Sequence, residues 1–257
     1  MLRYHARTLQ LLGVSPGISE SAVTELDSVE TRIGRRLPAS KREWYSLDGA
    51  CQILREYSND DRPLQISDLG LPRKDTSGGG PHDLLARNLV VYRYENQAVC
   101  VWAVQLDGSD DPPVVVNVDS QFKIWTRCAP TFSGHLHAWM WDYALVLRGD
   151  HLIQAQNQPL TTEAIGFLSQ HFDVGPETYG WPGDTQYRFF NDDQRILIWA
   201  GEDQADWWLS ADQEESRLRL VRTVWDCDNV GKSLWSNTGM DDSLLKQARG
   251  PRSQGNC

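Results

Sequence analysis

The chain lacks long apolar runs. None of its hydrophobic stretches approaches the roughly 18 residues that a membrane-spanning helix needs. The first residues, Met1 to His5, are not followed by the apolar stretch of a secretory signal. Hydrophobic residues make up 40% of the 257 residues, and the mean hydropathy is -0.50. The composition therefore predicts a water-soluble globular protein of one large or two small domains, without membrane contact.

The sequence also has few cysteines, and no two of them form a Cys-x-x-Cys pair. Their odd number and scattered spacing give no disulfide framework and no zinc or redox motif. Cys51 and Cys100 stand among apolar residues, which is typical of buried free thiols. We expect a protein of the reducing cytoplasm. The five cysteines are Cys51, Cys100, Cys128, Cys227 and Cys257.

Positive charge is scarce. The net charge is -10, from 25 basic and 35 acidic residues, and the isoelectric point is near 5.0. This balance argues against direct binding of nucleic-acid phosphates. The excess is uneven, because residues 151–257 contain 16 acidic and 9 basic residues. Such a surface either keeps the protein soluble or steers a basic partner, and the charge alone leaves both interpretations open.

Catalytic and metal-binding motifs are missing. The glycines at 78–80 are not followed by the Gly-Lys-Ser/Thr of a phosphate loop and predict a flexible connector. His135 and His137 are two residues apart on an expected helix and do not share a face. The segment from Asp226 begins like a calcium loop, but Val230 stands where an oxygen ligand is needed. The sequence therefore predicts no catalytic residue, no metal and no cofactor. Paired acids such as Asp60 and Asp61 are interpreted as solvated turns.

Hydrophobic periodicity predicts helices first and then strands over residues 14–148. Ser19 as N-cap and Gly34 as C-cap bound a helix over residues 18–34, and Ser40 with Glu43 predicts a capping box on the next. Residues 59–83 have the composition of a loop. The expected strands are 89–94, 98–106, 114–118 and 121–126, and a long helix follows over 132–147. The strand with Val99 to Val104 is apolar on both faces and should be central.

Residues 151–238 predict a second, smaller α/β unit. Its expected elements are a helix after Thr161, strands at 185–190, 195–200 and 205–211, and a closing helix with Leu218 and Val224. Residues 241–257 are polar and predict a disordered tail. The predicted class is α+β, with N-terminal helices, a central antiparallel sheet and a long helix, followed by an α-β-β-β-α extension.

Two acidic segments are candidate binding sites for a partner. In residues 107–113, Asp107, Asp110 and Asp111 precede two prolines. In residues 202–208, Glu202, Asp203 and Asp206 precede the adjacent Trp207 and Trp208. Adjacent residues on a strand point to opposite faces, so one tryptophan is expected to be exposed, and tryptophan is enriched at interface hot spots. Burial of that tryptophan under the closing helix is an equally good interpretation.

The order of elements resembles the SUKH superfamily, which includes a yeast cell-wall synthesis regulator and bacterial immunity proteins. The resemblance covers about residues 14–148 and depends on an ordered set of short pieces. Ala98 departs from the usual glycine at the start of its strand, and the loop before the sheet is longer than in minimal members. The matching pieces are Arg32 to Pro38, Arg42 to Tyr45, Asp48-Gly49, Glu95 to Gln97 with Trp102, Asp110 to Val114, Trp125 and Thr131 to Ser133.

The resemblance implies binding without catalysis. Bacterial SUKH proteins typically bind and neutralise a polymorphic toxin, often a nuclease, and the fold has no family-wide catalytic residues. Trp44, Trp102, Pro112 and Trp125 are expected to define the fold. The expected partner is a toxin or another protein with a basic surface. A regulatory scaffold without a toxin is the alternative, and carbohydrate binding through Trp181, Trp207 or Trp208 is a weaker one.

Overall fold

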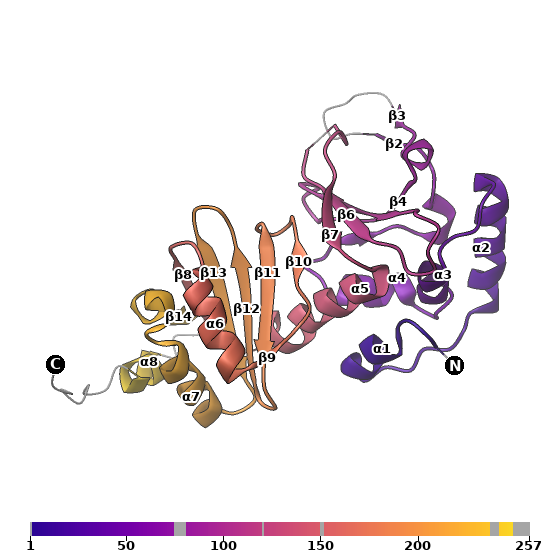
Figure 1. The fold of residues 1–257 in the computed structure, drawn as a ribbon. Coiled ribbons are helices and arrows are strands. Elements are labelled where there is room, and N and C mark those ends of the chain that lie inside the picture. Colours follow the sequence, from indigo (N-terminus) through magenta and orange to yellow (C-terminus); the bar gives the residue numbers. More distant parts are fainter. Residues whose placement is uncertain (1, 75–80, 120, 150–151, 237–241, 249–257) are drawn as a thin grey trace. The chain divides into compact units, whose positions relative to one another are not determined.

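The structure, a computed structural model, describes residues 2–74, 81–119, 121–149, 152–236 and 242–248. It divides into two compact units (Figure 1). Unit 1 comprises Met1–Trp141 and Thr178–Trp181, and unit 2 comprises Asp142–Glu177 and Pro182–Cys257. Both combine helices with antiparallel sheets, which confirms the α+β class. No helix in the described ranges is long and apolar enough to cross a membrane.

Unit 1 begins with short helices, and the longest of them lies where the sequence predicts it. In α2 (Glu20–Ile33), the Ser19 hydroxyl accepts a hydrogen bond from the Ala22 N–H, and Gly34 ends the helix at φ 68°. Glycine suits that left-handed conformation because it has no Cβ. The other N-terminal helices are α1 (Ala6–Leu12), α3 (Ala39–Tyr45) and α4 (Ala50–Glu56).

The expected capping box on α3 does not form. No side chain caps α3, and the Ser40 hydroxyl has no hydrogen-bond partner. The Glu43 carboxylate instead accepts hydrogen bonds from the backbone N–H groups of Arg3, Tyr4 and His5. Glu43 thus holds the N-terminal segment against α3. Capping rules consider only neighbours in the sequence, so they miss this contact.

The main sheet of unit 1 has the strand order β1-β4-β5-β6-β7, with every neighbouring pair antiparallel. The central strand β5 is buried from Val101 to Val104, as its apolar sequence predicts. The remaining elements are short: η1 (Ile66–Asp68), η2 (Leu85–Arg87), the β2–β3 hairpin and β10 (Thr178–Tyr179), which lies beside β7. The strand bounds are β1 Arg62–Pro63, β2 Arg73–Lys74, β3 Pro81–His82, β4 Leu89–Tyr94, β5 Val101–Gln105, β6 Val114–Asn117 and β7 Thr126–Ala129. The expected connector at 78–80 lies outside the described residues.

A register shift in β4 lets two consecutive side chains contact the same helix. The shift lies between Val91 and Arg93. Tyr92 then packs edge-on against Phe132 of α5 (Phe132–Trp141), and the Arg93 guanidinium lies 3.7 Å from the ring centre of Trp139 in the same helix. An extra residue in one strand produces this re-aiming, because it interrupts the alternation of faces.

The strand β7 starts later than predicted. Residues 121–125 form a loop rather than a strand, and β7 covers Thr126–Ala129. The Asp119 carboxylate accepts hydrogen bonds from the backbone N–H groups of Gln121, Lys123 and Ile124. Desolvation by burial raises the pKa of Asp119, but these donors and the Asn117 side chain together outweigh it and lower the pKa to about 2. The aspartate therefore organises the residues that β propensity assigns to a strand.

Unit 2 packs two helices against one face of an antiparallel sheet. The strand order is β11-β12-β13-β8-β14, and β9 pairs with the outer edge of β11. Figure 1 shows α6 lying across this sheet. Its core includes Ile198, Trp207, Leu168 of α6 and Leu220 of α7. The bounds are β8 Ile153–Asn157, α6 Thr162–His171, β9 Asp173–Val174, β11 Thr185–Phe190, β12 Gln194–Ala200, β13 Ala205–Ala211, α7 Glu214–Val224, η4 Cys227–Lys232, β14 Trp235–Ser236 and α8 Asp242–Ala248.

The elements of unit 2 that the sequence did not predict are β8, α8 and the short β9, η4 and β14. β8 precedes α6 and lies inside the sheet, so the extension is not simply α-β-β-β-α. Its sequence, Ile-Gln-Ala-Gln-Asn, alternates buried Ile153 and Ala155 with polar residues, but alanine makes the signal weak. The helix α8 lies in the expected disordered tail (residues 241–257), and its Leu245 is buried in the core. The rest of that tail is outside the described residues.

The division between the units falls at Asp142, not at residues 148–151. The π-helix η3 (Asp142–Leu147) continues directly from α5 but packs on β12 and β13. Asp142 is buried and makes a bidentate ion pair with Arg188 of β11, with two N–O distances of 2.6 Å. Ser210 of β13 also donates to the carbonyl of Leu145. These contacts assign the end of the long helix to unit 2.

Candidate functional site

The acidic loop of unit 1, defined as residues 107–111, is held at both ends. The Asp107 carboxylate accepts hydrogen bonds from the Ser109 N–H and hydroxyl, which lowers its pKa. Asp111 accepts from the N–H and hydroxyl of Ser133 at the start of α5. Asp110 is exposed and lies 3.6 Å from Arg3. Asp111 therefore anchors the loop, and Asp107 and Asp110 present their carboxylates to solvent.

The acidic segment of unit 2 is the turn between β12 and β13. Glu202 and Asp203 are exposed. Asp206 is half-buried on β13, and its carboxylate accepts hydrogen bonds from the side-chain amides of Gln156 and Gln204. The two acidic segments belong to different units, so each forms a separate candidate surface.

Trp207 does not contribute to a surface. Its side chain is 0% exposed, and its indole N–H donates to Asn157. The alternation along β13 turns Trp207 toward the helices and Trp208 toward the opposite face, where Trp208 is half-buried rather than exposed. The sequence could not choose between the two, because the covering helix α7 lies further along the chain.

The face of the sheet that carries Trp208 is rich in aromatic and amide groups. The Trp208 ring lies 4.1 Å from that of Trp199, measured between centroids. Gln154 pairs with Trp208 on one side and with Trp235 on the other, so the three side chains point to the same face. Trp235 is 41% exposed. This group, Trp199, Trp208, Trp235 and Gln154, is called the tryptophan face below.

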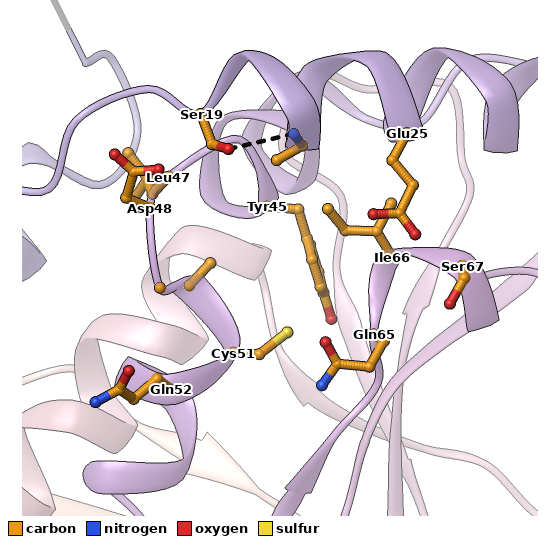
Figure 2. A pocket seen from close by; sticks show the side chains of 13 residues that line it. Ser19, Glu25, Tyr45, Leu47, Asp48, Cys51, Gln52, Gln65, Ile66 and Ser67 are labelled. Atoms are coloured by element: carbon orange, nitrogen blue, oxygen red, sulfur yellow. Dashed lines mark hydrogen bonds between the residues drawn. The ribbon is translucent and has the colours of Figure 1, made fainter.

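A cavity of about 370 Å³ lies in unit 1 between α2, α4 and the segment before η1. Figure 2 shows the Tyr45 ring, the Cys51 sulfur and the Gln65 amide approaching the same space from three elements. The Cys51 thiol donates to the Leu64 carbonyl at 3.4 Å. Burial, with a smaller contribution from Glu25, raises the pKa of Cys51 to about 11. Cys51 is therefore a neutral thiol at pH 7 and a poor nucleophile.

A second cavity, of about 650 Å³, shares Cys51, Gln52 and Gln65 with the first. Its other lining residues come from the end of α4, from β1 and from the turn after β4. We call it the Asp61 pocket. Its exposed lining residues carry charges of both signs, because Arg55 and Arg62 stand beside Asp60. Arg55 binds Asp60 at 2.7 Å. The remaining lining residues are Asp61, Pro63 and Asn96.

Asp61 is the unusual member of this pocket, because its side chain is only 1% exposed. The backbone N–H of Asp61 donates to the Ser58 hydroxyl. The backbone N–H of Asn96 donates to the Asp61 carboxylate. The preceding Asp60 adopts φ 57°, a left-handed conformation that aspartate tolerates better than most residues. This backbone turns the two neighbouring acids in different directions. The interpretation of both acids as a solvated turn is therefore wrong for Asp61.

Two acceptor oxygens of this pocket have no hydrogen-bond partner. They are Asp61 Oδ2 and Asn96 Oδ1, and both atoms are buried. The Arg93 Nε lies 3.6 Å from Asp61 Oδ2, which is beyond hydrogen-bonding distance. Burial raises the pKa of Asp61, and the charge of Arg93 opposes the rise. An unpaired buried polar group costs about 1–3 kcal/mol, so the pocket is suited to a hydrogen-bond donor.

One cysteine and one histidine of unit 1, Cys128 and His135, contact each other in its interior. Cys128 Sγ lies 3.5 Å from His135 Nδ1, and Arg93 donates to the other ring nitrogen at 3.3 Å. Cys128 of β7 and His135 of α5 are both buried. Across the described residues, no group of three or more His, Cys, Asp or Glu side chains is placed to hold a metal ion.

Comparisons of the chain with protein-family models, with curated proteins and with solved structures find no match. The assignment of a function therefore depends on the geometry of these surfaces and on the resemblance of the sequence pieces.

Proposed function

We propose that this chain is a non-enzymatic binding protein whose partner is a protein with a basic surface. The observation that carries the proposal is the acidic loop of unit 1. Asp107 is held by Ser109, and Asp111 by Ser133, so the exposed carboxylates occupy defined positions before a partner arrives. A preorganised loop loses less conformational entropy on binding than a mobile one.

Charge gives this loop a role in partner choice. Complementary charges across an interface accelerate association and exclude partners of the same sign. The lowered pKa of Asp107 keeps its carboxylate ionised at neutral pH. In the form that the SUKH resemblance implies, the partner is a toxin with a basic active-site surface, and the protein is its immunity protein. Binding then covers the surface that the toxin uses for its phosphate-bearing substrate.

The proposal is tested with the product of the neighbouring gene. The chain and that product are mixed, their complex is measured by size-exclusion chromatography and calorimetry, and the toxic activity is assayed with excess protein. We expect a complex that weakens with added salt and an inhibited toxin. Asp110→Lys is expected to weaken the complex by about tenfold or more. Asp192→Lys changes the charge equally in an exposed hairpin turn of unit 2 and should bind like the wild type.

Each outcome has a separate meaning. Full toxic activity in the presence of excess protein contradicts neutralisation. A complex without inhibition favours a regulatory scaffold. Equal binding by Asp110→Lys and Asp192→Lys excludes the acidic loop as the contact surface.

The tryptophan face favours carbohydrate binding as a second candidate function. Indole rings stack on the apolar faces of sugar rings, and the Gln154 amide can donate to and accept from hydroxyl groups. Titration with oligosaccharides should change the tryptophan fluorescence in a saturable way, and Trp208→Ala should abolish the change. Trp181→Ala, in unit 1, tests the other candidate tryptophan and should leave the response unchanged. A response that persists in Trp208→Ala would exclude this face.

A further inference from the structure

The Asp61 pocket has an unmet requirement for hydrogen-bond donors. Asp61 Oδ2 and Asn96 Oδ1 are both buried without a hydrogen-bond partner, although both residues line a cavity of about 650 Å³. The Asn96 amide nitrogen is already used, since it donates to the Asn59 carbonyl at 2.6 Å. The two residues are linked by the backbone N–H of Asn96, which donates to the Asp61 carboxylate.

Arg93 makes an ion pair with Asp61 Oδ2 at 3.6 Å without a hydrogen bond, and the two other arginines beside the pocket have partners of their own. Arg55 binds Asp60 at 2.7 Å, and Arg62 donates to the Glu95 carbonyl. Arg93 is held between two aromatic rings, 4.0 Å from Trp102 and 3.7 Å from Trp139, measured from its guanidinium carbon to the ring centres. The guanidinium of Arg93 is thus shared between the two rings and the ion pair with Asp61.

We propose that the Asp61 pocket receives a cationic side chain of the partner protein, arginine or lysine, with Asp61 as its counter-ion. The inference deepens the proposed function and rests on it, because it places an anchor for a basic partner in unit 1. A cationic donor is favoured over a neutral amide because hydrogen bonds between charged groups are roughly twice as strong as neutral ones. An anchor residue in a desolvated pocket is also the usual form of an interface hot spot.

The charges of the exposed lining residues predict which partner residues can enter the pocket. Arg62 is an exposed lining residue, so its charge repels an incoming cation and attracts an acidic neighbour of that cation. The pocket therefore selects a basic residue that is accompanied by an acidic one. Removing Arg62 should strengthen the binding of an isolated cation and should not strengthen that of an anion.

The test uses small probes and the full chain, without a partner. N-acetyl-arginine amide, N-acetyl-lysine amide and the neutral N-acetyl-citrulline amide are titrated while the protein amide resonances are recorded by NMR. We expect saturable shifts with the arginine or the lysine probe and about tenfold weaker binding, or none, with citrulline. The Arg62→Ala variant should bind the cationic probes a few-fold more tightly. Tighter binding of acetate than of either cation would overturn the assignment, because it would show that the pocket binds anions through its arginines.

Variants separate a binding role from a role in folding. Asp61→Asn should weaken the binding of the cationic probes by about tenfold or more, but it alters a buried group and can therefore also affect folding. Gln52→Arg therefore serves as a second variant, because the exposed Gln52 lines the pocket and an arginine there supplies an internal competitor. Gln10→Arg adds the same charge on exposed α1, away from the lining residues, and should bind the probes like the wild type. Unchanged probe binding in Gln52→Arg and in a folded Asp61→Asn would overturn the inference.

The two proposals fail in different ways. Probe binding that depends on Asp61, in a protein that binds no basic partner, retains the pocket and removes the proposed function. A partner complex that is weakened by Asp110→Lys and unaffected by Gln52→Arg retains the function and removes the pocket as its anchor.

Discussion

At the scale of single residues, Lys41 has the least ordinary environment in unit 1. Its side chain is 0% exposed, and its Nζ donates to the Val90 carbonyl at 3.2 Å. The same atom lies 5.8 Å from the ring centre of Tyr45 and 5.5 Å from that of Tyr92. Burial, followed by the charge of Arg73, lowers the pKa of Lys41 well below its ordinary value. The amine is therefore held where the neutral form is favoured over the charged one.

A lysine of lowered pKa makes stability depend on pH. The unfolded chain binds a proton at Lys41 below about pH 10.4, whereas the folded chain resists it. Stability therefore falls as the pH is lowered from about 10 toward the lowered pKa, by up to about 1.4 kcal/mol per pH unit. Lys41→Met removes this titration and keeps the length of the side chain. We expect its advantage in unfolding free energy to grow as the pH falls through this range.

Urea unfolding at a series of pH values measures this effect. The exposed Lys74→Met is the control and should follow the wild type. A constant difference between Lys41→Met and the wild type at every pH would show that Lys41 does not titrate in this way.

At the scale of elements, two glycines illustrate opposite requirements. Gly180 follows β10 at φ 88°, and a Cβ there would lie 2.5 Å from Val116 of β6. Gly166 is exposed within α6, and an added Cβ would meet no atom within 4 Å. The first position needs glycine for its conformation and for the close approach of β6, whereas the second does not.

The same substitution should therefore change stability in opposite directions. Gly180→Ala is expected to lower the unfolding free energy by about 1–3 kcal/mol, through the unfavourable φ and the overlap with Val116. Gly166→Ala is expected to raise it by about 0.5–1 kcal/mol, because alanine is favoured inside a helix. Chemical denaturation of both variants checks the signs. A stable Gly180→Ala would indicate that the segment after β10 does not pack on β6.

At the scale of the whole molecule, the binding features are divided between the two units. Unit 1 contains the acidic loop and the Asp61 pocket, and unit 2 contains the Glu202–Asp203 turn and the tryptophan face. The acidic excess is concentrated after residue 150, with 16 acidic and 9 basic residues. Unit 2 therefore contributes most of the long-range negative charge, whereas the buried carboxylate that can bind a cation lies in unit 1.

Local chemistry made some elements predictable. α2 follows from Ser19, Gly34 and an apolar stripe, because caps and periodicity act within a few residues. β5 follows from an uninterrupted apolar run that has to be covered on both faces. The assignment of residues 121–126 to a strand failed because the Asp119 carboxylate binds that backbone, and β8 was missed because it has only two apolar positions.

The sites were less predictable than the elements. The sequence identified the acidic loop, because a run of aspartates before two prolines is visible without a fold. It determined by itself the α+β class, the caps of α2, the central strand and the acidity. Only the tertiary structure decided that Trp207 is buried beneath helices, that Asp61 is buried beside Arg93, and that two acceptor oxygens of its pocket lack donors. The physical reason is that alternation along a strand separates two faces, whereas burial and hydrogen-bond pairing depend on residues distant in the chain.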